Sequence, residues 1–271
     1  MCQKAYSSKQ PVQIPTCRAK GYHGDSSQIY SSAKSTNPGI LKSMALISCI
    51  IAVFNGADYI NEAIRSVLHQ SMPVDQLIVV DDGSTDQTNA LVAAYGDQLI
   101  HIKKGHSGIA DTLNHGLQHA TGDFITFLDA DDIWDLEKTQ HQNTWLTENP
   151  RFDAVFCHVR EFVSPELSVE QATRLQVRPD AMRGLNKSCM MIRKPFFDQV
   201  GMFSVSDNMG DFIEWFTRAK AMNIQYEVLE DVLTMRRVHL HNFTRTQRGE
   251  MTNYTNILRR ALELKRQNSQ R

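Results

Sequence analysis

The sequence predicts an α/β fold in which a mainly parallel sheet is covered by helices on both faces. From residue 44 onward, short apolar runs typical of buried strands alternate with segments that have the apolar spacing of helices. Strands that alternate with helices through short loops form parallel pairs, because a parallel pair needs a crossover connection. A length of 271 residues and an apolar content of 41% allow one sizeable domain, or two halves that share a core.

The regular alternation lies in the first half of the chain. The apolar run ALISCIIAV at 45–53 predicts a buried strand, and the apolar residues of 58–70 fall on one face of a helix. The hydroxyl of Ser84 or Thr85 is expected to cap the next helix, which should end near Tyr95. Further strands are expected at 76–80, 99–103 and 124–128, and a further helix at 107–121.

The rhythm changes beyond Asn149. Strands are expected at 154–160 and 188–193, a helix at 211–222, and a polar, irregular segment at 164–180. An amphipathic, basic helix is predicted at 252–267, and packing against the body is favoured over attachment to a membrane surface. We therefore divide the chain into a disordered leader at 1–43, a first half at 44–148, a second half at 149–246 and a C-terminal helix at 247–271.

Composition excludes several classes of protein. The net charge of -1 gives no general attraction for nucleic acid or anionic lipid. Five scattered cysteines without a CxxC pair indicate neither a disulfide framework nor a zinc site. The apolar run at 45–54 has about half the length that a membrane-spanning helix needs. We expect a cytoplasmic protein, with peripheral contact at the inner face of the membrane as the remaining option.

Acidic residues follow two of the expected strands. Asp81 and Asp82 come after one strand, and Asp129, Asp131 and Asp132 come after another, where ligands of parallel sheets gather. Since side chains alternate along a strand, Asp129 and Asp131 should share a face, whereas Asp132 should cap or orient the chain that follows. Two convergent carboxylates suit Mg²⁺ or Mn²⁺. The alternative is that the acids only end the strand and cap a helix around Trp134.

Three segments together resemble a known family. The order ISCIIAVFNGADYINEAIRSVLHQ, QLIVVDDGSTDQT and GIADTLNHGLQHATGDFITFLDADD is similar to the nucleotide-binding half of family 2 glycosyltransferases. The resemblance covers 45–145 strongly and continues more loosely to about residue 246. It implies a GT-A fold, with a Rossmann-like nucleotide-binding half fused to a smaller acceptor-binding half.

The resemblance implies roles for the matching positions of the first half. Ala52, Val53 and Asn55 would line the nucleotide pocket, and Asp82 would bind the base. Asp129 would face the ribose or a metal ion, and Asp131 would be a direct ligand of Mn²⁺ or Mg²⁺. Two positions depart from the usual pattern: Ala52 stands where many members have Pro, and Leu113 precedes Asn114 where they have Arg.

The second half resembles the acceptor side of the same family. In VGMFSVSDNMGDFIEWFTRA, Asp211 matches the catalytic base, although Gly210 replaces the acid that usually precedes it. In MRRVHLHNFTR, the resemblance implies that His239 reaches the metal or phosphate and that Arg237 neutralises the leaving group. The residues alone leave two alternatives open, in which Asp211 is an N-cap and the basic segment is part of the surface.

The resemblance implies an inverting, metal-assisted transfer of a sugar from a nucleotide-diphosphate sugar to a glycan, lipid-linked or peptide acceptor. A UDP-sugar is the first candidate for the donor. A nucleotide-sugar-binding protein without catalysis is the second candidate, because the acceptor motif is imperfect. A dinucleotide-dependent oxidoreductase is disfavoured, since FNGADY stands where GxGxxG would be needed. His115 and His119 are four residues apart on a helix, but no third metal ligand accompanies them.

Overall fold

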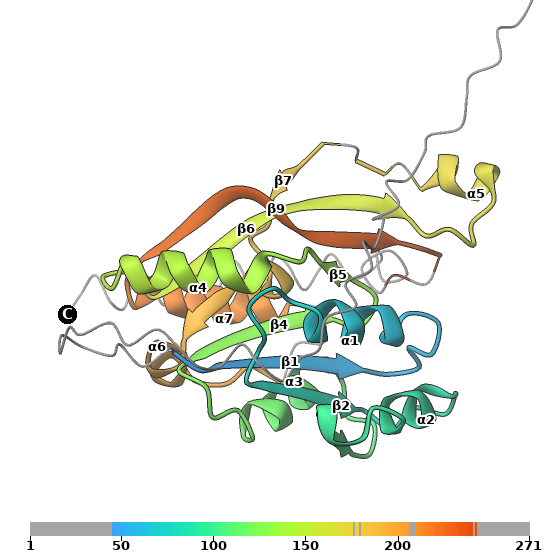
Figure 1. Ribbon diagram of the computed structural model, residues 1–271, viewed down its shortest axis with the longest axis horizontal. Helices are drawn as coiled ribbons and strands as arrows, with labels where there is room; N and C mark the ends of the chain where they lie inside the picture. Colours follow the sequence, from blue (N-terminus) through green and yellow to red (C-terminus); the bar gives the residue numbers. More distant parts are fainter. Residues whose placement is uncertain (1–44, 176, 179, 206–209, 241, 243–271) are drawn as a thin grey trace, which may run out of the picture. The chain divides into compact units, whose positions relative to one another are not determined.

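The computed structural model describes residues 45–175, 177–178, 180–205, 210–240 and 242 (Figure 1). The chain divides into two compact units, Met1–Ser43 and Met44–Arg271, and every described residue belongs to the second unit. The predicted leader at 1–43 and the predicted C-terminal helix at 252–267 lie outside the described residues.

Strands and helices alternate as predicted through the first half. The helices are α1 (Ile60–Leu68), α2 (Thr88–Ala93), α3 (Ile109–Leu117), α4 (Lys138–Glu148), α5 (Val169–Arg174), α6 (Lys194–Val200) and α7 (Asp211–Ala221), with 3₁₀ turns η1 (Gly96–Gln98) and η2 (Lys187–Cys189). The strands are β1 (Ile47–Val53), β2 (Gln76–Asp81), β3 (Ile100–Lys103), β4 (Phe124–Asp129), β5 (Ile133–Trp134), β6 (Ala154–Val163), β7 (Met182–Arg183), β8 (Met191–Arg193) and β9 (Tyr226–Val238).

Both halves of the chain contribute strands to one sheet. Its order is β3-β2-β1-β4-β8-β6-β9-β5, with β7 paired to β6. Strands β3, β2, β1 and β4 are parallel neighbours, whereas β8 joins the first half to the second through antiparallel pairs with β4 and β6. The sheet is therefore purely parallel among β1–β4 in the first half of the chain and mixed in the second half.

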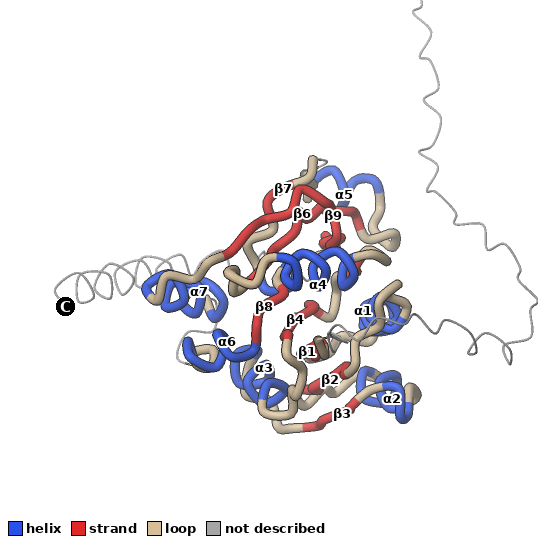
Figure 2. The backbone as a smooth tube through the Cα atoms, turned by 60° about the vertical axis from the view of Figure 1, so that its left-hand side comes forward, coloured by secondary structure: helices blue, strands red, loops and turns tan. Residues whose placement is uncertain are grey.

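Helices cover the parallel strands on both faces (Figure 2). Alternate residues of β1 and β2 pack on opposite sides, because successive side chains of a strand point to opposite faces. On one side Ile50 and Val80 lie in a core with residues of α3, α6 and α7. On the other side Ile51 and Val79 pack against α1 and α2. Burial on both faces explains why the first strand is an unbroken apolar run.

Two local predictions and one alternative were wrong. Helix α2 begins at Thr88 without a side-chain cap, because the Ser84 hydroxyl accepts a hydrogen bond from the backbone of Asn55. No helix surrounds Trp134, which lies in β5 and pairs with Thr234 of β9. The predicted irregular segment 164–180 contains the short helix α5, which begins with a capping box at Ser168.

Strand β9 was not predicted at all. It runs for 13 residues, and its three exposed positions, Glu227, Glu230 and Asp231, are acidic. Its pairing with β6 is parallel and contains register shifts around His158. In the described part of the chain, the helices are all too short or too polar to cross a membrane.

Candidate active site

The acids of the first half meet at one edge of the sheet. In the strand register, Val53 of β1 lies beside Asp81 of β2, and Ala52 lies beside Asp129 of β4. These strands are parallel and end together, so their loops share the carboxyl edge. The strand register therefore places these acids together at the carboxyl edge of the sheet, where the sequence predicted them.

Asp129 and Asp131 have different partners. Asp129 is the last residue of β4, and its Oδ1 lies 3.3 Å from Nζ of Lys187. Asp131 lies in the turn after the strand, and its Oδ2 is 3.0 Å from Nε2 of His239 and 3.2 Å from Nδ2 of Asn242. The alternation of side chains along a strand therefore does not set the direction of the Asp131 side chain, because β4 ends at Asp129.

The contact with His239 controls the ionisation of Asp131. Burial alone would raise the pKa of this carboxyl, but the hydrogen bond and charge of His239, together with the amide of Asn242, lower it below its ordinary value. The backbone of His239 is held in turn, because its N–H donates to Oδ1 of Asn242 at 2.7 Å. Asp131 is thus held as a carboxylate beside a fixed imidazole.

Asp132 has a structural role that differs from the prediction. It does not cap the chain that follows; its Oδ1 accepts a hydrogen bond from the backbone N–H of Arg237 at 3.0 Å. Burial, reinforced by the charges of Asp131 and Asp129, raises its pKa well above the ordinary value. Asp132 therefore joins the acidic turn to the end of β9.

Arg237 is buried, with 2% of its surface exposed. Its guanidinium donates to Oε2 of Glu62 at 2.5 Å and to the backbone oxygen of Asp131 at 3.0 Å. The rings of Tyr59 and Phe162 lie over the same group, at 4.9 and 4.7 Å from their centroids. The structure therefore uses Arg237 to hold β9 against the first half.

Asp82 organises the loop before α3. Its carboxylate accepts hydrogen bonds from Nζ of Lys104 and the backbone N–H groups of Ser107 and Gly108, at 2.9, 3.0 and 2.9 Å. Burial alone would raise the pKa of Asp82, but these donors outweigh burial and lower it. Gly108 precedes the helix with a φ of 96°, a conformation that favours glycine.

The other predicted pocket residues are held by the two cores and by the loop after β1. The side chain of Val53 packs in the core with α1, and Ala52 lies in the opposite core. Asn55 has a φ of 50°, and its Oδ1 accepts a hydrogen bond from the backbone N–H of Thr85 at 2.8 Å. Asn55 therefore ties the loop after β1 to the loop after β2, and its backbone shapes the carboxyl edge.

Asp211 is the first residue of α7, and Gly210 is the N-cap. Its Oδ2 is buried without a hydrogen-bond partner among the described residues, and Nζ of Lys187 lies 3.8 Å away. The alternative in which Asp211 is only an N-cap is wrong, because Gly210 holds the N-cap position and Asp211 is already inside the helix.

Three residues of this edge were missed from the sequence. Lys187 lies between Asp129 and Asp211, far from either in the chain. The rings of Phe54 and His106 are stacked, with centroids 4.1 Å apart, and Nδ1 of His106 lies 2.9 Å from Oδ2 of Asp82. Phe54 is 46% exposed although it is a large apolar residue. For Phe54, the available signal in the sequence was an aromatic residue directly after the strand predicted at 45–53.

The donor set at Asp131 suits a divalent cation. Mn²⁺ binds both carboxylate oxygen and imidazole nitrogen as ligands, and Mg²⁺ binds carboxylate oxygen. The side chains of Asp129 and Asp131 retain 35% and 31% of their exposure, so both can be reached from solvent. Among the described residues, no three His, Cys, Asp or Glu side chains form a ready metal cluster. The residues therefore fit an ion whose remaining ligands come from substrate or water.

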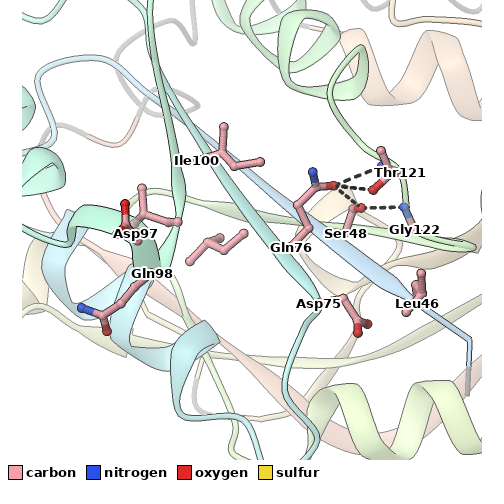
Figure 3. Close-up of a pocket in the computed structure, with 11 residues that line it drawn as sticks. Leu46, Ser48, Asp75, Gln76, Asp97, Gln98, Ile100, Thr121 and Gly122 are labelled. Atoms are coloured by element: carbon pink, nitrogen blue, oxygen red, sulfur yellow. Dashed lines mark hydrogen bonds between the residues drawn. The ribbon is translucent and has the colours of Figure 1, made fainter.

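A separate cavity of about 400 Å³ lies away from these residues (Figure 3). It is lined by residues at the amino ends of the strands, including Ser48, Gln76 and Ile100. The amide oxygen of Gln76 is occupied, because it accepts hydrogen bonds from the hydroxyl of Ser48 and the backbone of Thr121. The cavity thus lies at the edge of the sheet opposite to the acids.

Comparison with known proteins agrees with this arrangement. The model of the family described as "Glycosyl transferase family 2" matches residues 48–201, more than half of the chain. An uncharacterized glycosyltransferase of Rickettsia typhi is 28% identical over 221 residues, which cover 77% of this chain and 69% of the relative.

Two solved structures have a similar fold. S. aureus TarS in complex with UDP-GlcNAc has a TM-score of 0.64 at 20% identity, covering 81% of this chain and 66% of that one. The mannosyltransferase PcManGT from Pyrobaculum calidifontis, in complex with GDP-Man and Mn²⁺, has a TM-score of 0.60 at 20% identity, covering 82% and 65%. The chain thus spans about two thirds of the length of these relatives.

The fold and its acidic edge define a glycosyltransferase of the GT-A type. The chain belongs to glycosyl transferase family 2. The predicted family and fold class are therefore confirmed.

Proposed function

We propose that this protein transfers a sugar from a nucleotide-diphosphate sugar to an acceptor hydroxyl with inversion, assisted by a divalent cation. One observation carries the proposal. Asp129 and Asp211 lie on two sides of the same ammonium group, at 3.3 and 3.8 Å from Nζ of Lys187. An acid of the donor site and a candidate base are thereby brought to one place, as a transfer reaction requires.

The nucleotide is proposed to bind over the loops after β1 and β2. The exposed ring of Phe54 offers a face on which a base can stack, beside Asp82. A UDP-sugar is the first candidate, because TarS binds UDP-GlcNAc on the same fold; the GDP-Man complex of PcManGT makes a GDP-sugar the second. The acceptor is proposed to be a glycan, a lipid-linked sugar or a peptide.

Asp131 and His239 would hold Mn²⁺ or Mg²⁺, with Asp129 close by. The ion, when bound, supplies positive charge that offsets the charge developing on the leaving diphosphate. Arg237 does not share this role in our proposal, since its guanidinium is buried against Glu62.

Asp211 is proposed to be the general base. Its carboxylate takes the proton of the acceptor hydroxyl, whose oxygen forms a bond to the anomeric carbon. The bond from that carbon to the diphosphate oxygen breaks with its electron pair, and the nucleoside diphosphate leaves. One displacement from the opposite face inverts the anomeric centre. The free, buried Oδ2 of Asp211 supports this assignment, because no other group of the described chain occupies it by a hydrogen bond.

The experiment that tests the function is a donor screen followed by turnover. Thermal shift with Mn²⁺ and UDP-, GDP-, CDP- and TDP-sugars identifies the donor. Release of the nucleoside diphosphate is then measured with acceptor mixtures, with and without EDTA. We expect turnover that EDTA abolishes. A protein that is stabilised by a donor but never turns it over would be a non-catalytic nucleotide-sugar-binding protein.

A further inference from the structure

Lys187 is a cation of the candidate site to which neither the family resemblance nor the comparisons assign a role. Its ammonium contacts Oδ1 of Asp129 at 3.3 Å and Oδ2 of Asp211 at 3.8 Å, and only 14% of the side chain is exposed. Lys187 therefore bridges an acid of the first half and an acid of the second half of the site.

The turn that carries Lys187 is firmly held. Lys187 opens the 3₁₀ turn η2, where Oδ1 of Asn186 accepts a hydrogen bond from the backbone of Cys189 at 3.0 Å. The hydroxyl of Ser188 accepts a hydrogen bond from the backbone N–H of Asp129 at 3.0 Å. The backbone carbonyl of Ser188 accepts a hydrogen bond from the indole N–H of Trp134 at 3.1 Å. The backbone at Lys187 is thus attached directly to the end of β4.

Gly184 adds to this rigidity. A Cβ placed on it would collide with Sγ of Cys189 and with the backbone oxygen of Cys157. The chain therefore approaches β6 more closely here than any other residue would allow. Such packing positions the amine of Lys187 in advance of ligand binding, which reduces the rearrangement needed during a reaction.

Asp211 depends on this amine more than Asp129 does. Asp129 has 35% of its side chain exposed and can be solvated, whereas the side chain of Asp211 is 12% exposed. The buried Oδ2 of Asp211 has no hydrogen-bond donor among the described residues, so a nearby positive charge is what compensates its burial. At 3.8 Å, Lys187 supplies that charge without forming a hydrogen bond to the oxygen.

We propose that Lys187 is a positioning residue that holds the carboxylate of Asp211 ready to accept the acceptor's proton and couples it to Asp129 on the donor side. This inference rests on the proposed function, in which Asp211 is the base. When Asp211 takes the proton and becomes neutral, Lys187 keeps Asp129 as its ionic partner. The amine therefore never remains buried without a counter-charge during the transfer.

The test is a double-mutant cycle on the full-length protein. The variants are Lys187→Met, Asp211→Asn, the double variant, and Lys187→Arg as the conservative replacement; Lys220→Met, an exposed lysine of α7, is the matched control. Release of UDP or GDP from UDP-GlcNAc and GDP-mannose is measured with water and acceptor mixtures. UDP and Mn²⁺ affinities are measured by calorimetry, and melting temperatures at pH 8.

We expect Lys187→Met to lower kcat by about tenfold or more while the donor KM changes less than about threefold. The loss should vanish in the Asp211→Asn background, and Lys187→Arg should recover most of the rate. Lys187→Met should lower the melting temperature by about 2–4 °C in the wild type and by less than half of that beside Asp211→Asn.

Other results would overturn the inference. Equal losses of kcat in both backgrounds would mean that Lys187 does not act through Asp211, and a change in KM or UDP affinity alone would make it a donor-binding group. An unchanged rate in Asp211→Asn would instead overturn the proposed base. If neither donor is turned over, the proposed function fails for these donors. The double-mutant cycle on melting temperatures then decides by itself whether Lys187 and Asp211 are coupled.

Discussion

Oδ2 of Asp131 and Nε2 of His239 lie 3.0 Å apart, although 108 positions separate the two residues in the chain. One belongs to the turn after β4 and the other follows the last strand of the sheet. The pair places a carboxylate from the first half beside an imidazole from the second. It is the arrangement on which the proposed metal dependence rests.

Replacing Asp131 with Ala is expected to abolish metal-dependent nucleotide binding. The variant removes the carboxylate that His239 and Asn242 orient, and the ion loses a direct ligand. Calorimetry with UDP, with and without Mn²⁺, measures the effect. Asp97→Ala, which removes an exposed acid at the opposite edge, is the control and should bind normally. Undiminished Mn²⁺-supported binding by Asp131→Ala would remove this residue from the site.

Replacing Asp211 with Asn is expected to retain donor binding and to lose about 10²-fold or more in kcat, the usual scale for loss of a general base. The amide keeps the size of the side chain but cannot take the acceptor's proton. Steady-state kinetics with UDP affinity measured in parallel separates the two effects. A rate near that of the wild type would refute the assignment.

Replacing Phe54 with Ala is expected to weaken UDP binding by about 5- to 100-fold, since stacking of a base on an aromatic ring contributes about 1–3 kcal/mol. The ring is exposed and stacked on His106, so its loss should disturb the core little. Phe54→Tyr preserves the ring and should bind UDP with near wild-type affinity. Equal affinities of the Ala and Tyr variants would show that no base stacks there.

Asp82 predicts a pH dependence of stability. Its pKa is lower in the folded protein than the value of about 3.9 in an unfolded chain, so its contribution is complete above that value and is lost as the pH falls through the folded pKa. Asp82→Asn should therefore reduce the free energy of unfolding at pH 7 by about 1–3 kcal/mol. Urea denaturation at pH 3 should show a smaller difference. A difference that is constant with pH would contradict the role of the charge.

Lys138 predicts a second rise of stability with pH, in the alkaline range. The residue is fully buried, and its amine contacts Oε1 of Gln142 at 2.7 Å and Oγ1 of Thr126 at 3.3 Å. Burial lowers its pKa in the folded state, so protonation below that pKa opposes folding. Stability should rise as the pH passes from the folded pKa towards about 10.4, the unfolded value.

Thermal denaturation between pH 7.5 and 10.5 checks this trend. Lys138→Met should remove the rise and should be at least as stable as the wild type at pH 7.5, because no buried charge remains. Lys103→Met, which removes an exposed lysine of β3, should leave the rise in place. A rise that persists in Lys138→Met would show that another group causes it.

Much of the fold follows from local patterns. The unbroken apolar strands, the helical spacing between them and the acids at the strand ends specified the parallel half and the edge that carries Asp129. Strand β9 escaped prediction because its ladder with β6 is irregular and acidic residues at its exposed positions interrupt the apolar pattern. Such a segment has no simple alternation of apolar and polar residues.

Only part of the site could be predicted from the sequence, for a different reason. The pairing of Asp131 with His239 and of Lys187 with Asp211 depends on how distant elements pack, which no local pattern encodes. At Arg237 the local pattern is misleading. The segment around it is basic, which is typical of a surface, but its guanidinium is buried. Basic residues are usually exposed, and the carboxylate of Glu62, far away in the chain, reverses that preference here.

The burial of Arg237 bears on how this protein could exchange parts with its relatives. Its guanidinium joins Glu62 of α1, and its backbone joins Asp132, so the segment that bears His239 takes its place from residues of the other half. A homologue that imports the second half of this chain would inherit the imidazole of His239 but not the first-half groups that hold this segment in place. Glu62 and Asp132 would have to be transplanted with it, which makes these two positions compatibility determinants for recombination within the family.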